Sequence, residues 1–252
     1  MQMHLDTIPL WDSFREGDGC PLCRLTAYLE EQFLDGTLGG AAMEPDIRIM
    51  SNEKGYCLRH FKALYDRKQR LPLALITHTH LVTTREKLDP LMEQYLHPPV
   101  KKQGLFAKKT AEADPVAEIL NILEQQDGSC MICQRVEGHM ARYLETCADL
   151  YRKDETFARL YREGKGFCLP HFRGLLQAGK GLSGKARESF LTDTLTLEQG
   201  LLDTLDTDLK AFTMMFDYRS AGKDFGPARD ALPRTIAGLR GNAIPMEGKK
   251  ST

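Results

Sequence analysis

A Cys-x-x-Cys pair followed by a Cys-x-x-His pair occurs twice in this chain of 252 residues, and this repeat restricts the fold more than any other feature. GDGCPLCRL at 17–25 matches DGSCMICQRV at 127–136, and KGYCLRHFKALY at 54–65 matches KGFCLPHFRGLL at 165–176. The first pair is displaced by 110 positions and the second by 111, which a single inserted residue explains. A repeat of this kind predicts two equivalent structural modules.

The residue types in the repeated pairs are those that bind zinc. A structural zinc ion takes four nitrogen or sulfur donors in a tetrahedron. Cys-x-x-Cys offers two sulfurs from one turn, and Cys-x-x-His offers two donors from one helical turn, because residues three apart share a helix face. Pro21 and Pro170 lie inside the pairs, and proline is tolerated only in a first helical turn. We therefore expect both pairs to open helices, where free N–H groups and the helix dipole stabilise thiolates.

Each module thus contains a complete Cys₃His set, and we predict two metal ions per chain. We expect the ligands of one module to share an ion. Duplication also permits an exchanged arrangement, in which the first pair of one module meets the second pair of the other. The predicted ligand sets are Cys20, Cys23, Cys57 and His60 in the first module, and Cys130, Cys133, Cys168 and His171 in the second.

Zinc is the preferred metal, and an iron–sulfur cluster is the main alternative, because such clusters also use thiolates and can accept histidine. The spacing of the ligands does not separate the two. A thiol redox pair fits less well, since CPLC at 20–23 lacks the βαβ context of thioredoxin-like proteins and leaves the repeated histidines unexplained. Buried free cysteines beside core histidines would not account for the doubled pattern.

Apolar residues at helical spacing predict an all-α fold. The stripe Val116, Ile119, Leu120 and Leu123 indicates a helix that Asp114 caps. Leucines and phenylalanines over 191–216 follow a 4-3 spacing, which is typical of a long helix packed along a partner. Its counterpart in the first module is 72–96, where we expect a helix although ITHTHLVTT at 76–84 is rich in β-branched residues.

The repeat and these helices predict the domain organisation. The first helical module covers 1–96 and the second covers 114–216. Residues 97–113, HPPVKKQGLFAKKTAEA, form a linker whose lysines we interpret as a solvated charge run. Glycine and proline accumulate in 217–252, which predicts a loop-rich C-terminal arm with one short helix near 228–239.

Composition and charge narrow the class of protein. The hydrophobic fraction of 42% and the charged fraction of 27% are those of a globular chain. A formal net charge of −1 favours neither nucleic acid nor an anionic membrane as partner. The longest aliphatic run, 71–76, contains a proline, and the N-terminal segment has acidic residues where a secretory signal has basic ones. We expect a cytoplasmic protein without a membrane span, in which thiols stay reduced.

Weaker motifs have ordinary explanations. GKGLSGKA at 179–186 nearly spells a phosphate-binding loop, but Ala186 replaces the magnesium-binding hydroxyl and a helical segment precedes it, so we expect a helix–helix loop. The unpaired Cys147 lies on an apolar stripe and is expected in the core. His78 and His80 diverge if 76–84 is helical, and we assign them ordinary polar roles.

The chain resembles a bacterial family of uncharacterised proteins with paired CxxC…G[YF]CLxHF modules. In that family the modules are followed by a C-terminal segment similar to FDYRSAGKDFGPARDAL at 216–232 of this chain. The resemblance covers most of the chain and implies a helical metal-binding protein without an established activity. We expect structural metals in a scaffold or in a protein that binds an unidentified protein partner, rather than an enzyme. The alternatives are an iron–sulfur or thiol redox protein and a nucleotide-dependent enzyme that uses 179–186.

Overall fold

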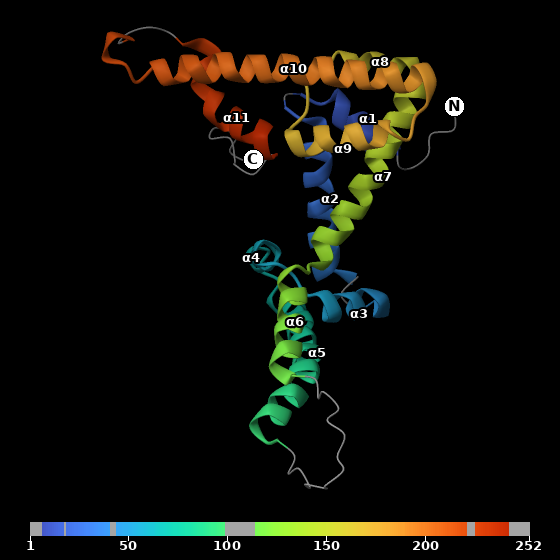
Figure 1. Ribbon diagram of the computed structural model, residues 1–252, viewed down its shortest axis with the longest axis vertical. Coiled ribbons are helices and arrows are strands. Elements are labelled where there is room, and N and C mark those ends of the chain that lie inside the picture. Colours follow the sequence, from blue (N-terminus) through green and yellow to red (C-terminus); the bar gives the residue numbers. More distant parts are fainter. Residues whose placement is uncertain (1–6, 18, 41–43, 99–113, 221–224, 242–252) are drawn as a thin grey trace, which may run out of the picture. The chain divides into compact units, whose positions relative to one another are not determined.

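The computed structural model describes residues 7–17, 19–40, 44–98, 114–220 and 225–241, and all regular structure in these ranges is helical (Figure 1). The all-α prediction is therefore confirmed. The α-helices are α1 (Thr7–Arg15), α2 (Pro21–Leu38), α3 (Pro45–Lys54), α4 (Leu58–Asp66), α5 (Arg70–Leu96), α6 (Pro115–Asp127), α7 (Met131–Lys153), α8 (Glu155–Arg162), α9 (Leu169–Gly179), α10 (Gly184–Met214) and α11 (Ala231–Arg240), with the short 3₁₀ helices η2 (Tyr218–Ser220) and η3 (Gly226–Asp230).

Packing divides the chain into two compact units, one built from residues 1–28 and 138–252 and the other from residues 29–137. Both boundaries fall inside helices that begin at a Cys-x-x-Cys pair, namely α2 and α7. These units are defined by packing, whereas the modules at 1–96 and 114–216 were defined by the sequence repeat. The module boundaries therefore remain a prediction. Of the predicted linker 97–113, all but the first two residues lie outside the described ranges.

The discontinuous unit is organised around α10, which contacts α8, α9, α11 and η3 (Figure 1). Its core is aromatic. The ring of Phe157 on α8 lies 5.1 Å from the rings of both Trp11 and Phe14 on α1, and the ring of Tyr161 lies 5.5 Å from that of Phe190 on α10. Edge-to-face and tilted aromatic pairs of this kind stabilise a core beyond the area that they bury. They also attach the segment before Cys20 to the segment before Cys168.

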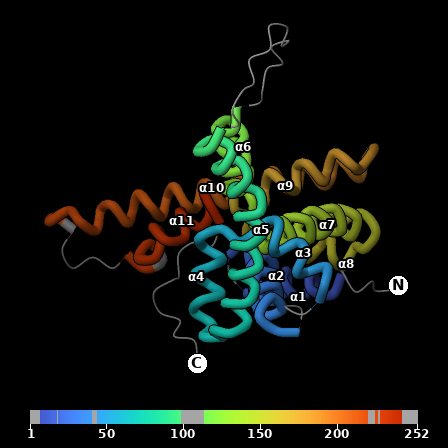
Figure 2. The backbone as a smooth tube through the Cα atoms, turned by 90° about the horizontal axis from the view of Figure 1, so that it is seen from below, coloured from blue at the N-terminus to red at the C-terminus, as the bar shows by residue number. Residues whose placement is uncertain are grey.

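The continuous unit is organised around α5, which contacts α3, α4 and α6 (Figure 2). The threonine-rich segment 76–84 is helical, as expected. The hydroxyl groups of Thr77 and Thr79 donate hydrogen bonds to backbone carbonyls of the preceding turn. The predicted stripe on α6 forms a helix capped by the Asp114 carboxylate. Leu120 and Leu123 on that stripe remain 55% and 41% exposed, so α6 rests on α5 without a buried residue of its own.

The C-terminal arm contains one α-helix in the described residues, α11, close to the predicted 228–239. It packs on α9 and α10. No described helix combines the length and the apolar character that a bilayer span requires.

Candidate metal centres

The eight predicted ligands gather in two groups of four, and within each group the donor atoms lie within 4.8 Å of one another. The pairing that we expected within each module is wrong, because each group combines the Cys-x-x-Cys pair of one module with the Cys-x-x-His pair of the other. We call the group in the discontinuous unit site 1 and the group in the continuous unit site 2. Site 1 contains Cys20, Cys23, Cys168 and His171, and site 2 contains Cys57, His60, Cys130 and Cys133.

Every ligand pair lies at a helix N-terminus. Cys57 and Cys168 are the N-cap residues of α4 and α9, and Cys20 and Cys130 directly precede α2 and α7. The second ligand of each pair follows three residues later in the first turn, so both donors leave the same side of the helix end. Three thiolates and one divalent ion would give each site a net charge of −1. The positive ends of two helix dipoles, each equivalent to about +0.5 charge, offset it.

The spacing of the donors is close to that around a single tetrahedral ion. Four donors about 2.0–2.3 Å from one ion lie about 3.3–3.8 Å from one another. At site 1 the Nδ1 atom of His171 lies 3.6, 3.5 and 3.1 Å from the three sulfurs, and the Sγ atoms of Cys23 and Cys168 lie 3.4 Å apart. At site 2 the Nδ1 atom of His60 lies 3.2, 3.2 and 3.4 Å from the sulfurs, and Cys57 and Cys133 are 3.9 Å apart.

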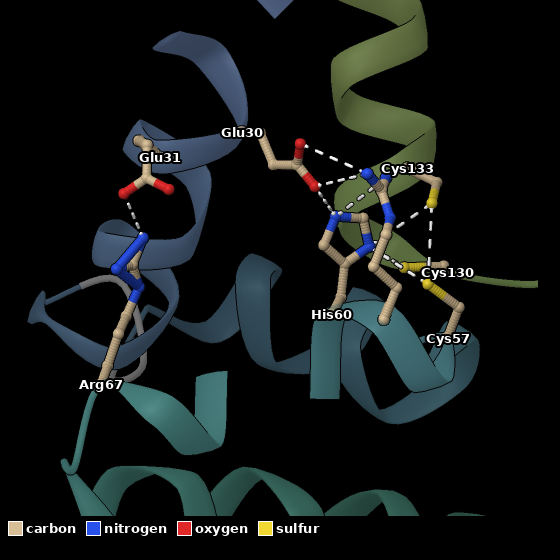
Figure 3. Close-up of polar contacts among 8 residues, drawn as sticks. Glu30, Glu31, Cys57, His60, Arg67, Cys130 and Cys133 are labelled. Carbon is tan, nitrogen blue, oxygen red and sulfur yellow. Dashed lines mark hydrogen bonds and ion pairs between the residues drawn. The ribbon is translucent and has the colours of Figure 1, made fainter. Parts of the chain in front are cut away.

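At site 2 a carboxylate accepts a hydrogen bond from the histidine (Figure 3). The Nε2 atom of His60 lies 2.7 Å from Oε1 of Glu30, on the ring edge opposite the sulfurs. An ionised carboxylate only accepts hydrogen bonds, so the proton of the neutral ring resides on Nε2 and Nδ1 keeps its lone pair. Metal-bound histidines typically donate their second N–H to such a partner.

At site 1 a hydroxyl group accepts the corresponding hydrogen bond from His171. The Nε2 atom of His171 lies 3.2 Å from Oγ1 of Thr26. That hydroxyl donates its own hydrogen to the carbonyl of Leu22 at 2.8 Å, so it accepts from the ring. Nδ1 is again the free donor atom, and it faces the sulfurs.

A family model matches nearly the whole chain. The model of a family of unknown function, DUF6062, matches residues 1–245. The chain belongs to DUF6062. Searches of the curated proteins and of the solved structures found no match to it.

Without an ion, the donors of this DUF6062 chain compete for protons. Burial acts to lower the pKa of His60, but hydrogen bonds with Cys130 and Glu30 outweigh it and raise that pKa to about 9. Burial and the neighbouring Cys130 thiolate raise the pKa of Cys133. Hydrogen bonds with Cys20 and Cys23 raise the pKa of Cys168, so three thiolates do not form together in either site unless a cation compensates them.

A glycine with positive φ precedes the Cys-x-x-His pair of each site. Gly55 has φ 58°, and a Cβ there would collide with the ring of His80 on α5. Its carbonyl accepts the Met131 N–H at 3.0 Å, which joins the two ligand segments of site 2. Gly166 has φ 92°, and a Cβ there would collide with Leu201 and with the backbone carbonyl oxygen of Leu197, both on α10. Each long helix therefore supports the loop that carries a ligating cysteine.

Sequence reasoning missed the residues behind the ligands. Thr26 and Glu30 correspond in the repeat to Val136 and Met140, which have no matching polar group, so comparison of the modules gives no indication of them. His80, assigned an ordinary polar role, donates from Nδ1 to the carbonyl of Asn52 at 2.8 Å and fills the space beside Gly55.

The remaining motifs of the chain belong to neither group of donors. Residues 180–183 join α9 to α10, as the helix–helix interpretation of 179–186 predicts. Cys147 is fully buried, and burial raises the pKa of its thiol. His78 and His80 both lie within α5 and belong to neither group of donors.

Proposed function

We propose that the protein binds two zinc ions, one at each site, and that the ions are structural. The observation that carries the proposal is that two sets of four donors, from segments far apart in the chain, meet at the spacing of one tetrahedral ion. A set of four protein donors is typical of structural zinc, whereas catalytic zinc keeps one position for water or substrate. We propose no catalytic role for the chain.

The donor spacing favours one ion over a cluster. In an iron–sulfur cluster the four ligands are distributed over two or four iron ions, so ligand atoms on different irons lie further apart than donors that share one ion. The Sγ–Sγ distance of 3.4 Å at site 1 fits a shared ion. A thiol redox role would leave unexplained why both histidines direct Nδ1 at three sulfurs.

The biological role that fits this chemistry is a metal-stabilised scaffold or a protein that binds a protein partner in the cytoplasm. Reduced thiols, which zinc requires, are stable in that compartment. The nucleotide-dependent alternative has less support, because α9 rather than a strand precedes the 179–186 loop.

The test is elemental analysis of protein purified without chelator and under anaerobic conditions. We expect two zinc ions per chain and no visible absorption. A visible charge-transfer spectrum with iron in the sample would establish the cluster instead. Fewer than two ions per chain, after an attempt to reload with zinc, would refute the proposal.

A further inference from the structure

The two histidines differ in what lies behind them. The Nε2 atom of His171 in site 1 lies 3.2 Å from the neutral hydroxyl of Thr26. The Nε2 atom of His60 in site 2 lies 2.7 Å from the carboxylate of Glu30. A carboxylate behind a metal-bound imidazole raises the basicity of the donor nitrogen more than a hydroxyl does, because its full charge stabilises the partial positive charge on the ring.

The surroundings of Glu30 hold its carboxylate in place. Nη1 of Arg59 donates to Oε2 of Glu30 at 3.4 Å and lies 3.0 Å from Oε1 as an ion pair, and Arg59 follows Cys57 by two residues, on α4. The ring of His60 is fully buried, so the Glu30 carboxylate takes the place of water at Nε2. Arg59 corresponds to Pro170 in the second module, so site 1 has no equivalent of this ion pair.

We propose that Glu30 is the positioning residue of site 2, which fixes the tautomer of His60 and strengthens its hold on the metal. The inference rests on the proposed function, because it concerns the affinity of an ion at site 2.

Glu31 provides a matched control in the same helix (Figure 3). It is the next residue of α2, carries the same charge, and pairs with Arg67 at 2.6 Å rather than with a ligand. Its side chain is 64% exposed, against 22% for Glu30. If the acidic character of α2 alone mattered, the two residues would have equal effects.

The experiment measures both zinc affinities by competition with a chromogenic chelator in the wild type and three variants. We expect Glu30→Ala to weaken one of the two ions by about 10–100-fold, the range for partners of metal-bound histidines. Glu30→Gln keeps an acceptor oxygen and should lose less, and Glu31→Ala should match the wild type. Nitrogen NMR of the zinc-loaded wild type should find the ring proton of His60 on Nε2. In the spectrum of Glu30→Ala, the signal of this Nε2 proton should be broadened or lost.

The outcomes separate this inference from the proposed function. Fewer than two zinc ions in the wild type would refute the proposed function itself. Two ions in the wild type, with equal affinities in Glu30→Ala and Glu31→Ala, would overturn the role of Glu30 alone. Circular dichroism of each variant, and an unchanged second ion in Glu30→Ala, exclude general unfolding as the cause of a loss.

Discussion

The Sγ atoms of Cys23 and Cys168 lie 3.4 Å apart, although 145 residues separate them in the chain. An ion between them would join the first cysteine motif of the chain to the last. At site 2 the corresponding separation, between Cys57 and Cys133, is 76 residues. The exchanged pairing therefore makes each ion a long-range crosslink, and it specifies which ligands share an ion.

Paired substitutions test the exchanged sets. Cys23→Ser and Cys168→Ser should each remove one zinc ion, and the double variant should remove the same single ion, because both residues belong to site 1. Combining Cys23→Ser with Cys57→Ser should remove both ions. Elemental analysis after desalting gives the counts. If the second double variant retained one ion, the pairing within modules would be correct instead.

Removal of the metals should lower the stability sharply. Each ion closes a loop whose entropy the unfolded chain would otherwise retain. Structural zinc in small fingers contributes roughly 10–16 kcal/mol of apparent binding free energy, against domain stabilities of about 5–15 kcal/mol. We expect strong chelation to lower the midpoint of thermal unfolding by more than about 10 °C, while helices with apolar cores of their own keep part of the circular dichroism signal. An unchanged midpoint in fully stripped protein would show that the metals are not structural.

The sequence predicted the helical class and both halves of each site, but not how the halves combine. KGYCLRHF and KGFCLPHF are nearly identical, so neither contains information on which Cys-x-x-Cys it meets. That choice depends on tertiary packing, such as the contact of Phe14 with Phe167, the residue before Cys168, which no local motif encodes. Glu30 was not predictable for a related reason, since its role arises from a residue thirty positions away.

Zinc binding at site 2 should release protons. The pKa of His60 is raised to about 9 in the metal-free protein, so at neutral pH its ring carries a proton that the ion must displace. The pKa of Cys133 is also raised. We expect the affinity of site 2 to increase as the pH rises from 6 toward about 9, where His60 becomes neutral without help from the metal. Calorimetric titrations in buffers of different ionisation enthalpy count the protons, and a buffer-independent heat would contradict this prediction.

The positive-φ glycines should be sensitive to alanine. A Cβ at Gly166 would lie 2.7 Å from Cβ of Leu201 and 3.0 Å from the carbonyl oxygen of Leu197, which belongs to the backbone of α10. With φ of 92° adding strain of about 1–2 kcal/mol, we expect Gly166→Ala to cost more than about 2 kcal/mol. At Gly55 the three nearest atoms all belong to the His80 ring, so Gly55→Ala combined with His80→Ala should recover the part of the loss that comes from this collision, while the strain of φ 58° remains.

The control for both glycines is Gly138, which lies inside α7 and has no atom within 4 Å of its Cβ position apart from its chain neighbours and the nearby backbone of its own helix. Gly138→Ala should stabilise the protein by about 0.5–1 kcal/mol, since alanine has the better helix propensity. Chemical unfolding of the zinc-loaded variants measures all these effects. Equal responses at positions 138 and 166 would mean that the turn before Cys168 does not depend on glycine.

A buried carboxylate beside site 1 should make stability depend on pH. Glu198 on α10 is 2% exposed, and one oxygen accepts the Phe167 N–H at 3.1 Å while the other has no hydrogen-bond partner. Burial raises the pKa of Glu198 above its ordinary value of 4.5. Because the folded state holds this proton to higher pH than the unfolded state, its favourable contribution is complete below pH 4.5 and is lost as the pH rises through the folded pKa.

Glu198→Gln should therefore stabilise the protein at pH 8 and have little effect at pH 4. The amide keeps an oxygen for the Phe167 N–H and removes the buried charge, although its NH₂ group gains no partner. Leaving a buried polar group unsatisfied costs about 1–3 kcal/mol, and more for a charged group, so we expect a net gain of about 1 kcal/mol, or a few degrees in Tm. Thermal melts at both pH values, with the exposed Glu188→Gln on the same helix as control, measure the difference. If Glu198→Gln raised the Tm equally at pH 4, the effect would come from packing rather than from the charge of Glu198.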